Sequence, residues 1–244
     1  MSRLTYRSWS LLVPLMAFIL VSPTATSAAS EARFVTHGNR DKATIALTFD
    51  DGWGTPNCQK IVNILEATKT PATFLPNAKW VRLAPAFWTH VAALGFPLAN
   101  HTTNHADLTK LSAAKQYQEI NSDRRIIEAI TGVPMTRVLR PPFGAFNPTT
   151  LREAAAAGFP LVMNWDTTFA DTSRRPDGTL WPLRAYLRTA SRGGNGSILL
   201  GHCGSPVDYR ILRKVIAGYR ARGLEFVTIP QMFGLPNAQA MTFG

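Results

Sequence analysis

Residues 43–52 read A-T-I-A-L-T-F-D-D-G, an apolar and β-branched run that ends in two aspartates and a glycine. Such a run predicts a buried strand that enters a loop at its carboxyl end. Similar short apolar runs recur along the chain, and helical patterns separate most of them. The predicted strands cover residues 43–49, 72–75, 97–100, 138–140, 161–165, 197–200 and 225–229. Alternation of this kind predicts an α/β fold with about seven parallel strands.

The segments between these strands carry helical periodicity and helix-end residues. Asn147-Pro148, for example, suits an N-cap and a first helical turn, and Gly158 suits the end of that helix. No internal repeat or linker interrupts the pattern, so we expect residues 30–244 to form one domain. A domain of this length suits barrel-like closure better than two Rossmann halves. The predicted helices cover residues 58–69, 85–94, 112–130, 147–157, 184–192 and 207–222.

The composition excludes two classes of protein. The chain has 244 residues, of which 45% are hydrophobic and 17% charged, too apolar for a disordered protein. Two cysteines are too few for a disulfide-framework miniprotein. The formal net charge of +11 indicates anionic surroundings or partners but says nothing about the fold.

The first thirty residues have the pattern of an export signal. Arg3 and Arg7 precede an apolar run over residues 11–21, and small and polar residues follow it. The run is too short to span a bilayer, which takes about twenty residues. We predict a signal peptide over residues 1–29, a secreted or extracytoplasmic mature chain, and no stable membrane insertion after cleavage. The alternative is an uncleaved membrane anchor.

Chemically active side chains collect at the carboxyl ends of the predicted strands. The set comprises Asp50, Asp51, His101, His105, Arg140 and His202. Each cluster alone has an ordinary explanation: Asp-Asp-Gly is typical of a turn, and H-x-x-x-H of a solvated helix face. Their common position at the carboxyl ends of the strands is what indicates a site, because parallel α/β folds build their sites there.

Two histidines and a carboxylate are a common catalytic zinc set, although other first-row metals use it too. His101 and His105 are four positions apart, so one helical turn would place both rings on one face. Either Asp50 or Asp51 can supply the carboxylate, which leaves the other as a general base. Arg140 is the candidate cation that orients this base.

Four motifs in this order resemble those of polysaccharide deacetylases with a NodB homology domain, carbohydrate esterase family 4. They are T-F-D-D-G (48–52), H-T-T-N-H (101–105), R-P-P-F-G (140–144) and I-L-L-G-H (198–202). The resemblance covers roughly residues 43–233. It implies a distorted (β/α) barrel, which agrees with the predicted strand count.

The resemblance also implies residue roles. Asp50 would be the catalytic base, oriented by Arg140. His202 would be the general acid that protonates the leaving amine, and the backbone N–H of Phe143 would stabilise the oxyanion. A divalent metal, usually zinc and sometimes cobalt or nickel, would be held by Asp51, His101 and His105.

One motif departs from the family pattern D-x-x-D-W. This chain reads N-W-D-T-T-F-A-D-T over residues 164–172, and Thr172 stands in place of the tryptophan. The carboxylate that tunes His202 is therefore either Asp166 or Asp171. We expect three residues to contact the sugar, although Trp53 could instead only pack at the rim: Trp53, Pro142 and Trp165.

Cys58 and Cys203 could pair in an exported protein. In a closed barrel the early and late strands meet, which would bring the two cysteine loops together and favours a disulfide.

The predicted function is a secreted, metal-dependent polysaccharide deacetylase that hydrolyses N-acetyl groups of GlcNAc-containing polymers, of chitin type or peptidoglycan, and releases acetate. An O-acetyl xylan esterase would use the same residues, and the altered motif leaves room for a non-catalytic carbohydrate-binding relative. Residues 179–244 carry eight Lys and Arg against two acidic residues, which favours an anionic cell wall, or simply solubility. We expect a monomer whose partner is the acetylated polysaccharide. The export signal argues against nucleic acid.

Overall fold

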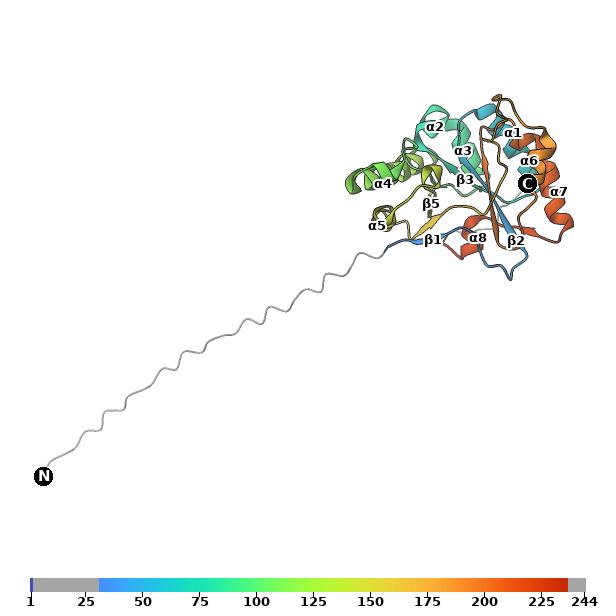
Figure 1. Ribbon diagram of the computed structural model, residues 1–244. Coiled ribbons are helices and arrows are strands. Elements are labelled where there is room, and N and C mark those ends of the chain that lie inside the picture. The colour runs from blue at the N-terminus through green and yellow to red at the C-terminus, as the bar shows by residue number, and fades with distance from the viewer. Residues whose placement is uncertain (2–30, 237–244) are drawn as a thin grey trace.

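The computed structural model describes Met1 and residues 31–236 (Figure 1). The predicted signal peptide lies outside the described residues. Within the described part, none of the helices combines the length and the apolar character that a membrane crossing requires.

The described strands and helices alternate for most of the chain. The strands are β1 (Arg33–Val35), β2 (Thr44–Asp51), β3 (Thr73–Pro76), β4 (Ala99–Asn100), β5 (Thr136–Leu139), β6 (Leu161–Met163), β7 (Thr167–Thr168), β8 (Ser197–His202) and β9 (Glu225–Phe226). The helices are α1 (Thr55–Ala67), α2 (Ala78–Leu83), α3 (Pro85–Ala93), α4 (Ala113–Thr131), α5 (Pro148–Ala156), α6 (Leu183–Ala190), α7 (Asp208–Ala221) and α8 (Ile229–Phe233). Two short 3₁₀ helices are η1 (Leu108–Lys110) and η2 (Pro142–Gly144).

The strands form two sheets, and every pairing between them is parallel. One sheet has the order β1-β6-β5-β4, and the other has the order β3-β2-β8-β7 with β9 beside β2. Two single bridges connect the sheets, a parallel one between Phe74 and Leu98 and an antiparallel one between His37 and Ser197. The predicted α/β fold with parallel strands is confirmed, with isolated bridges in place of a continuous barrel ladder.

Strand β2 lies at the centre of its sheet and is buried along most of its length. Ile45, Leu47 and Phe49 belong to the large core cluster with the buried faces of the helices. Ala46 belongs to a second cluster, built from the opposite faces of the strands. Since side chains alternate along a strand, Asp50 lies on the same face as Ala46, at the carboxyl end of β2.

Helix α8 packs against the amino-terminal end of the sheet. It follows β9, which pairs with the first residues of β2, and the N–H of Ile229 donates to Thr73 Oγ1 at 2.9 Å. Ile229 belongs to the same interior cluster as Ala46. One end of the interior is therefore filled by apolar side chains, and the polar residues lie at the other, carboxyl end of the strands.

Candidate active site

The carboxyl ends of β2, β4, β5 and β8 meet around one cavity of about 450 Å³. The register pairs Asp50 of β2 with His202 of β8, so residues far apart in sequence become neighbours. Both residues belong to their strands, which run slightly further than the sequence predicts. The cavity is lined by Asp50, Asp51, Trp53, His101, His105, Pro141, Phe143, Trp165, Thr172, Leu200 and His202.

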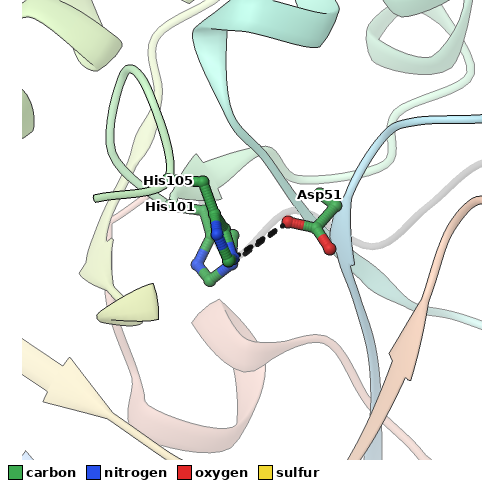
Figure 2. A group of neighbouring side chains, drawn as sticks. All are labelled: Asp51, His101 and His105. Carbon is green, nitrogen blue, oxygen red and sulfur yellow. Dashed lines mark ion pairs between the residues drawn. The ribbon is translucent and has the colours of Figure 1, made fainter. Parts of the chain in front are cut away.

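Asp51, His101 and His105 form a cluster with the composition of a metal site (Figure 2). Their candidate ligand atoms all lie within 4.8 Å of one another. Asp51 Oδ1 is 3.5 Å from His101 Nε2 and 3.2 Å from His105 Nε2. Asp51 has a positive φ of 70°, which breaks the strand alternation, and its carboxylate lines the same cavity as that of Asp50.

The prediction that one helical turn brings the two histidines together is wrong. Residues 101–105 form a loop in which Thr102 and His105 have φ values of 66° and 58°. Polar contacts with helix α4 hold this loop: the N–H of Asn104 donates to Glu119 Oε2 at 2.9 Å. The imidazole rings still converge, with centroids 4.9 Å apart.

The environment of the histidines suits a cation. His101 Nδ1 lies 2.8 Å from the carbonyl oxygen of Arg140, which can only accept, so Nδ1 carries the hydrogen. In the neutral ring Nε2 then presents its lone pair towards Asp51. Burial and the neighbouring His101 lower the pKa of His105, which favours the neutral imidazole that metal binding requires. A divalent cation would complement these donors.

A buried carboxylate braces the same loop from behind. Asp123 of α4 is fully buried and accepts hydrogen bonds from the N–H groups of Ala78, at 2.7 Å, and His101, at 3.3 Å. Burial raises the pKa of Asp123 well above its ordinary value. Asp123 and Glu119 were not among the residues predicted from sequence. They stand four positions apart on one helix, where the sequence pattern does not distinguish them from solvated acidic residues.

Asp50 and Arg140 form a buried ion pair beside this cluster. The Arg140 guanidinium donates through Nη1 to Asp50 Oδ1 at 2.6 Å and to Thr48 Oγ1 at 3.0 Å. Arg140 is fully buried, and the Asp50 side chain is 4% exposed. Such a pair orients a carboxylate strongly, because removing the cation would leave a buried charge unpaired.

His202 is paired with Asp171. Its Nδ1 lies 3.0 Å and 3.1 Å from the two oxygens of the Asp171 carboxylate. Burial alone would lower the pKa of His202, but the hydrogen bond and charge of Asp171, together with Asp50 and Asp51, raise it to about 9. The imidazole is therefore charged at neutral pH.

This pairing decides between the two carboxylates that the sequence left open. Asp166 lies away from His202 and instead binds Arg40 at 2.7 Å, the Ser197 hydroxyl at 2.9 Å and the N–H of Ile198 at 2.9 Å. Asp166 thus joins the start of β8 to Arg40, which lies in the loop between β1 and β2.

A second buried carboxylate, which the sequence analysis did not predict, supports the end of β8 at His202. Asp208, at the start of α7, accepts a hydrogen bond from the N–H of His202 at 2.8 Å. Burial and the charge of Asp171 raise its pKa well above the ordinary value.

Aromatic rings surround the mouth of the cavity. Trp53 and Phe143 are 36% and 69% exposed, and Trp165 lines the cavity beside them. Phe143 has a φ of 61°, so the R-P-P-F-G segment turns sharply at that residue. Pro142, which was expected to contact the sugar, is instead buried, and Pro141 takes its place in the cavity wall.

Cys58 and Cys203 form a disulfide, with Cα atoms 4.6 Å apart. They are separated by 145 positions in the sequence. The bond joins helix α1 to the residue that follows His202, and thus ties the loop after β2 to the loop after β8. The expectation drawn from a closed barrel is confirmed.

Residues 37–162 match the family model described as polysaccharide deacetylase. The chain is 28% identical over 196 residues to a peptidoglycan-N-acetylmuramic acid deacetylase of Bacillus subtilis (strain 168), covering 80% of this chain and 73% of the relative. It is 31% identical over 218 residues to a chitooligosaccharide deacetylase of Rhizobium leguminosarum bv. trifolii, covering 83% and 97%. A solved family 4 carbohydrate esterase from Bacillus anthracis superimposes with a TM-score of 0.69 and 26% identity, covering 82% of this chain and 87% of that one.

Proposed function

Because the chain belongs to the polysaccharide deacetylase family, we propose that it is a secreted, metal-dependent enzyme that hydrolyses N-acetyl groups of GlcNAc-containing polymers and releases acetate. The observation that carries this proposal is that three groups of interacting side chains converge on one cavity. These are the Asp51–His101–His105 cluster, the Asp50–Arg140 pair and the His202–Asp171 pair. Relatives named for peptidoglycan and for chitooligosaccharides support those two substrate classes.

Asp51, His101 and His105 would hold the divalent metal. We propose zinc first, with cobalt or nickel as alternatives, because two imidazoles and a carboxylate with open positions form a zinc set. When bound, such a metal supplies a Lewis acid that polarises the acetyl carbonyl and lowers the pKa of a bound water.

Asp50 is the proposed general base. Its Oδ2 lies 3.8 Å from His101 Nε2, so the carboxylate borders the metal cluster without belonging to it. The other oxygen is fixed by Arg140 at 2.6 Å. Asp50 can therefore accept the proton of the attacking water in a defined orientation.

His202 is the proposed general acid. Asp171 holds Nδ1, so Nε2 is the nitrogen left to deliver a proton into the cavity. An amine is a poor leaving group until it is protonated. With the pKa of His202 raised to about 9, this proton is present at neutral pH.

The backbone N–H of Phe143 is the proposed donor to the oxyanion. The positive φ of Phe143 sets the direction of the local backbone, and its side chain lines the cavity. A fixed N–H costs no reorganisation when negative charge develops on the acetyl oxygen.

Two features support export. Residues 1–29 have the arrangement of a signal peptide. The Cys58–Cys203 disulfide suits an oxidising compartment outside the cytoplasm.

The test is the variant Asp50→Asn in zinc-loaded mature protein. We expect acetate release from chitooligosaccharides to fall at least about a hundredfold, since a general base contributes about 10²–10⁴ in rate. Zinc content, measured by elemental analysis, should stay at the wild-type level. Loss of zinc from this variant would contradict the assigned roles of Asp50 and Asp51, and unchanged acetate release would refute the base.

A further inference from the structure

A second, smaller cavity of about 170 Å³ lies beside the active site. It is lined by Ala170, Ser173, Trp181, Ala185, Tyr186 and Thr189. The segment around Asp171 forms the wall between the two cavities, because Thr172 lines the catalytic cavity and the next residue, Ser173, lines the second. Adjacent Cα atoms are only about 3.8 Å apart, so the two cavities adjoin the same short segment of chain.

Internal hydrogen bonds organise this second cavity. The Tyr186 hydroxyl on α6 accepts from the N–H of Trp181 at 3.1 Å and donates to the carbonyl of Ser173 at 2.8 Å. Tyr186 is 2% exposed, whereas Trp181 is 40% exposed. Both ends of the loop over residues 173–181 are thus bound to Tyr186 of helix α6. The indole of Trp181 is left at the surface as an aromatic platform.

One arginine covers part of the platform, and a second follows it in the sequence. The Arg175 guanidinium lies over the Trp181 ring, 5.7 Å from its centre, and Arg184 is exposed three residues after Trp181. Arg174 donates to the carbonyls of Asp171 and Ser173. Within the described residues none of these three arginines forms an ion pair.

The only acidic residue between positions 172 and 192 is Asp177. Its carboxylate accepts hydrogen bonds from the N–H and the hydroxyl of Thr179. The loop and the start of α6 are therefore electropositive, and guanidinium groups are well suited to bind carboxylates through paired hydrogen bonds.

We propose that this second cavity is a binding site for a neighbouring, carboxylate-bearing sugar of the same acetylated glycan. The face of the sugar would lie against Trp181, and its carboxylate would bind Arg175 and Arg184. The inference rests on the proposed function, since it names the substrate class of that site: an anionic glycan in preference to a neutral one.

The experiment measures glycan binding by calorimetry in the zinc-loaded Asp50→Asn protein, which does not depend on turnover. The probes are a soluble peptidoglycan glycan strand whose stem peptides have been removed, so that its muramic acid sugars carry free carboxylates, and a neutral chitooligosaccharide of equal sugar number. The test variants are Trp181→Ala and the double variant Arg175→Gln/Arg184→Gln. The matched controls are Tyr117→Ala and Arg210→Gln/Arg213→Gln, which alter exposed residues on α4 and α7.

We expect the arginine double variant to weaken binding of the carboxylated fragment about tenfold and binding of the neutral probe about twofold or less. Trp181→Ala should weaken both probes, and the controls should bind as the parent does. Equal loss for both probes in the arginine variant, or wild-type binding in Trp181→Ala, would overturn the proposal. If binding follows these expectations but the wild-type protein releases no acetate, the proposed function fails while the binding site stands.

Discussion

Replacing Asp171 with asparagine should shift the alkaline limit of deacetylation to lower pH. Asp171 bonds His202 Nδ1 at 3.0 Å, and the carboxylates raise the pKa of His202 from 6.5 to about 9 against the opposing effect of burial. That difference is worth about 3 kcal/mol in favour of the protonated ring. Asparagine keeps the size of the side chain but weakens the hydrogen bond and removes the charge, which are the two largest effects that raise this pKa.

The size of the effect follows from the fraction of His202 that carries a proton. At pH 8 a pKa of about 9 leaves about 90% of the rings protonated, whereas the ordinary value of 6.5 leaves about 3%. If the Asp171→Asn substitution returns His202 to its ordinary pKa, the rate should fall about thirtyfold at pH 8 but only about 1.3-fold at pH 6. The alkaline limit must move to lower pH, because the protonated form of a general acid is lost as the pH rises through its pKa.

The assay is acetate release at saturating substrate from pH 5.5 to 9.5, and the zinc content of the protein is measured at the lowest and the highest pH. Asp166→Asn is the matched control, because Asp166 contacts Arg40 and Ser197 in place of His202. A loss in Asp171→Asn that is equal at every pH would refute the reasoning. So would an alkaline limit that stays where the wild type has it.

Two further predictions concern the frame of the site. The Cys58→Ala/Cys203→Ala variant should lower the free energy of unfolding by up to about 5 kcal/mol, because the bond closes a loop of about 145 residues; denaturant melts measure this, and stability equal to the wild type would contradict it. Asp123→Ala should weaken zinc binding about ten- to a hundredfold, because it removes the acceptor for the N–H of His101. Competitive chelator titration measures the affinity, with Asp41→Ala on an exposed turn as control. Unchanged affinity in a folded Asp123→Ala variant would refute the supporting role of Asp123.

The long elements could be predicted from sequence because their local pattern and packing agree. Helix α4 and strand β2, for example, lie within two residues of their expected bounds. The two-residue strand β7 and the short helices α2 and α8 were not predicted. Their windows are too short for periodicity, and tertiary contacts decide them, as the bond from Ile229 to Thr73 illustrates.

The residues of the site were predictable because strand ends converge, but their local geometry was not. A spacing of four between His101 and His105 fits a helical turn. It also fits the irregular loop in the structure, in which Thr102 and His105 have positive φ values. Asp166 and Asp171 stand five positions apart on one irregular segment, so only the fold could show which one meets His202. Asp123 and Asp208 lie within helical patterns, where an acidic residue is normally solvated, and their burial depends on tertiary packing.

Acetate release by the zinc-loaded mature chain, with and without chelator, decides whether the site is a metal-dependent deacetylase. The substrates are peptidoglycan, chitooligosaccharide and acetylated xylan. We predict release from an N-acetylated glycan that chelator abolishes and added zinc restores. Release that persists after the metal is shown to be removed, or release from acetylated xylan alone, would contradict the proposed function.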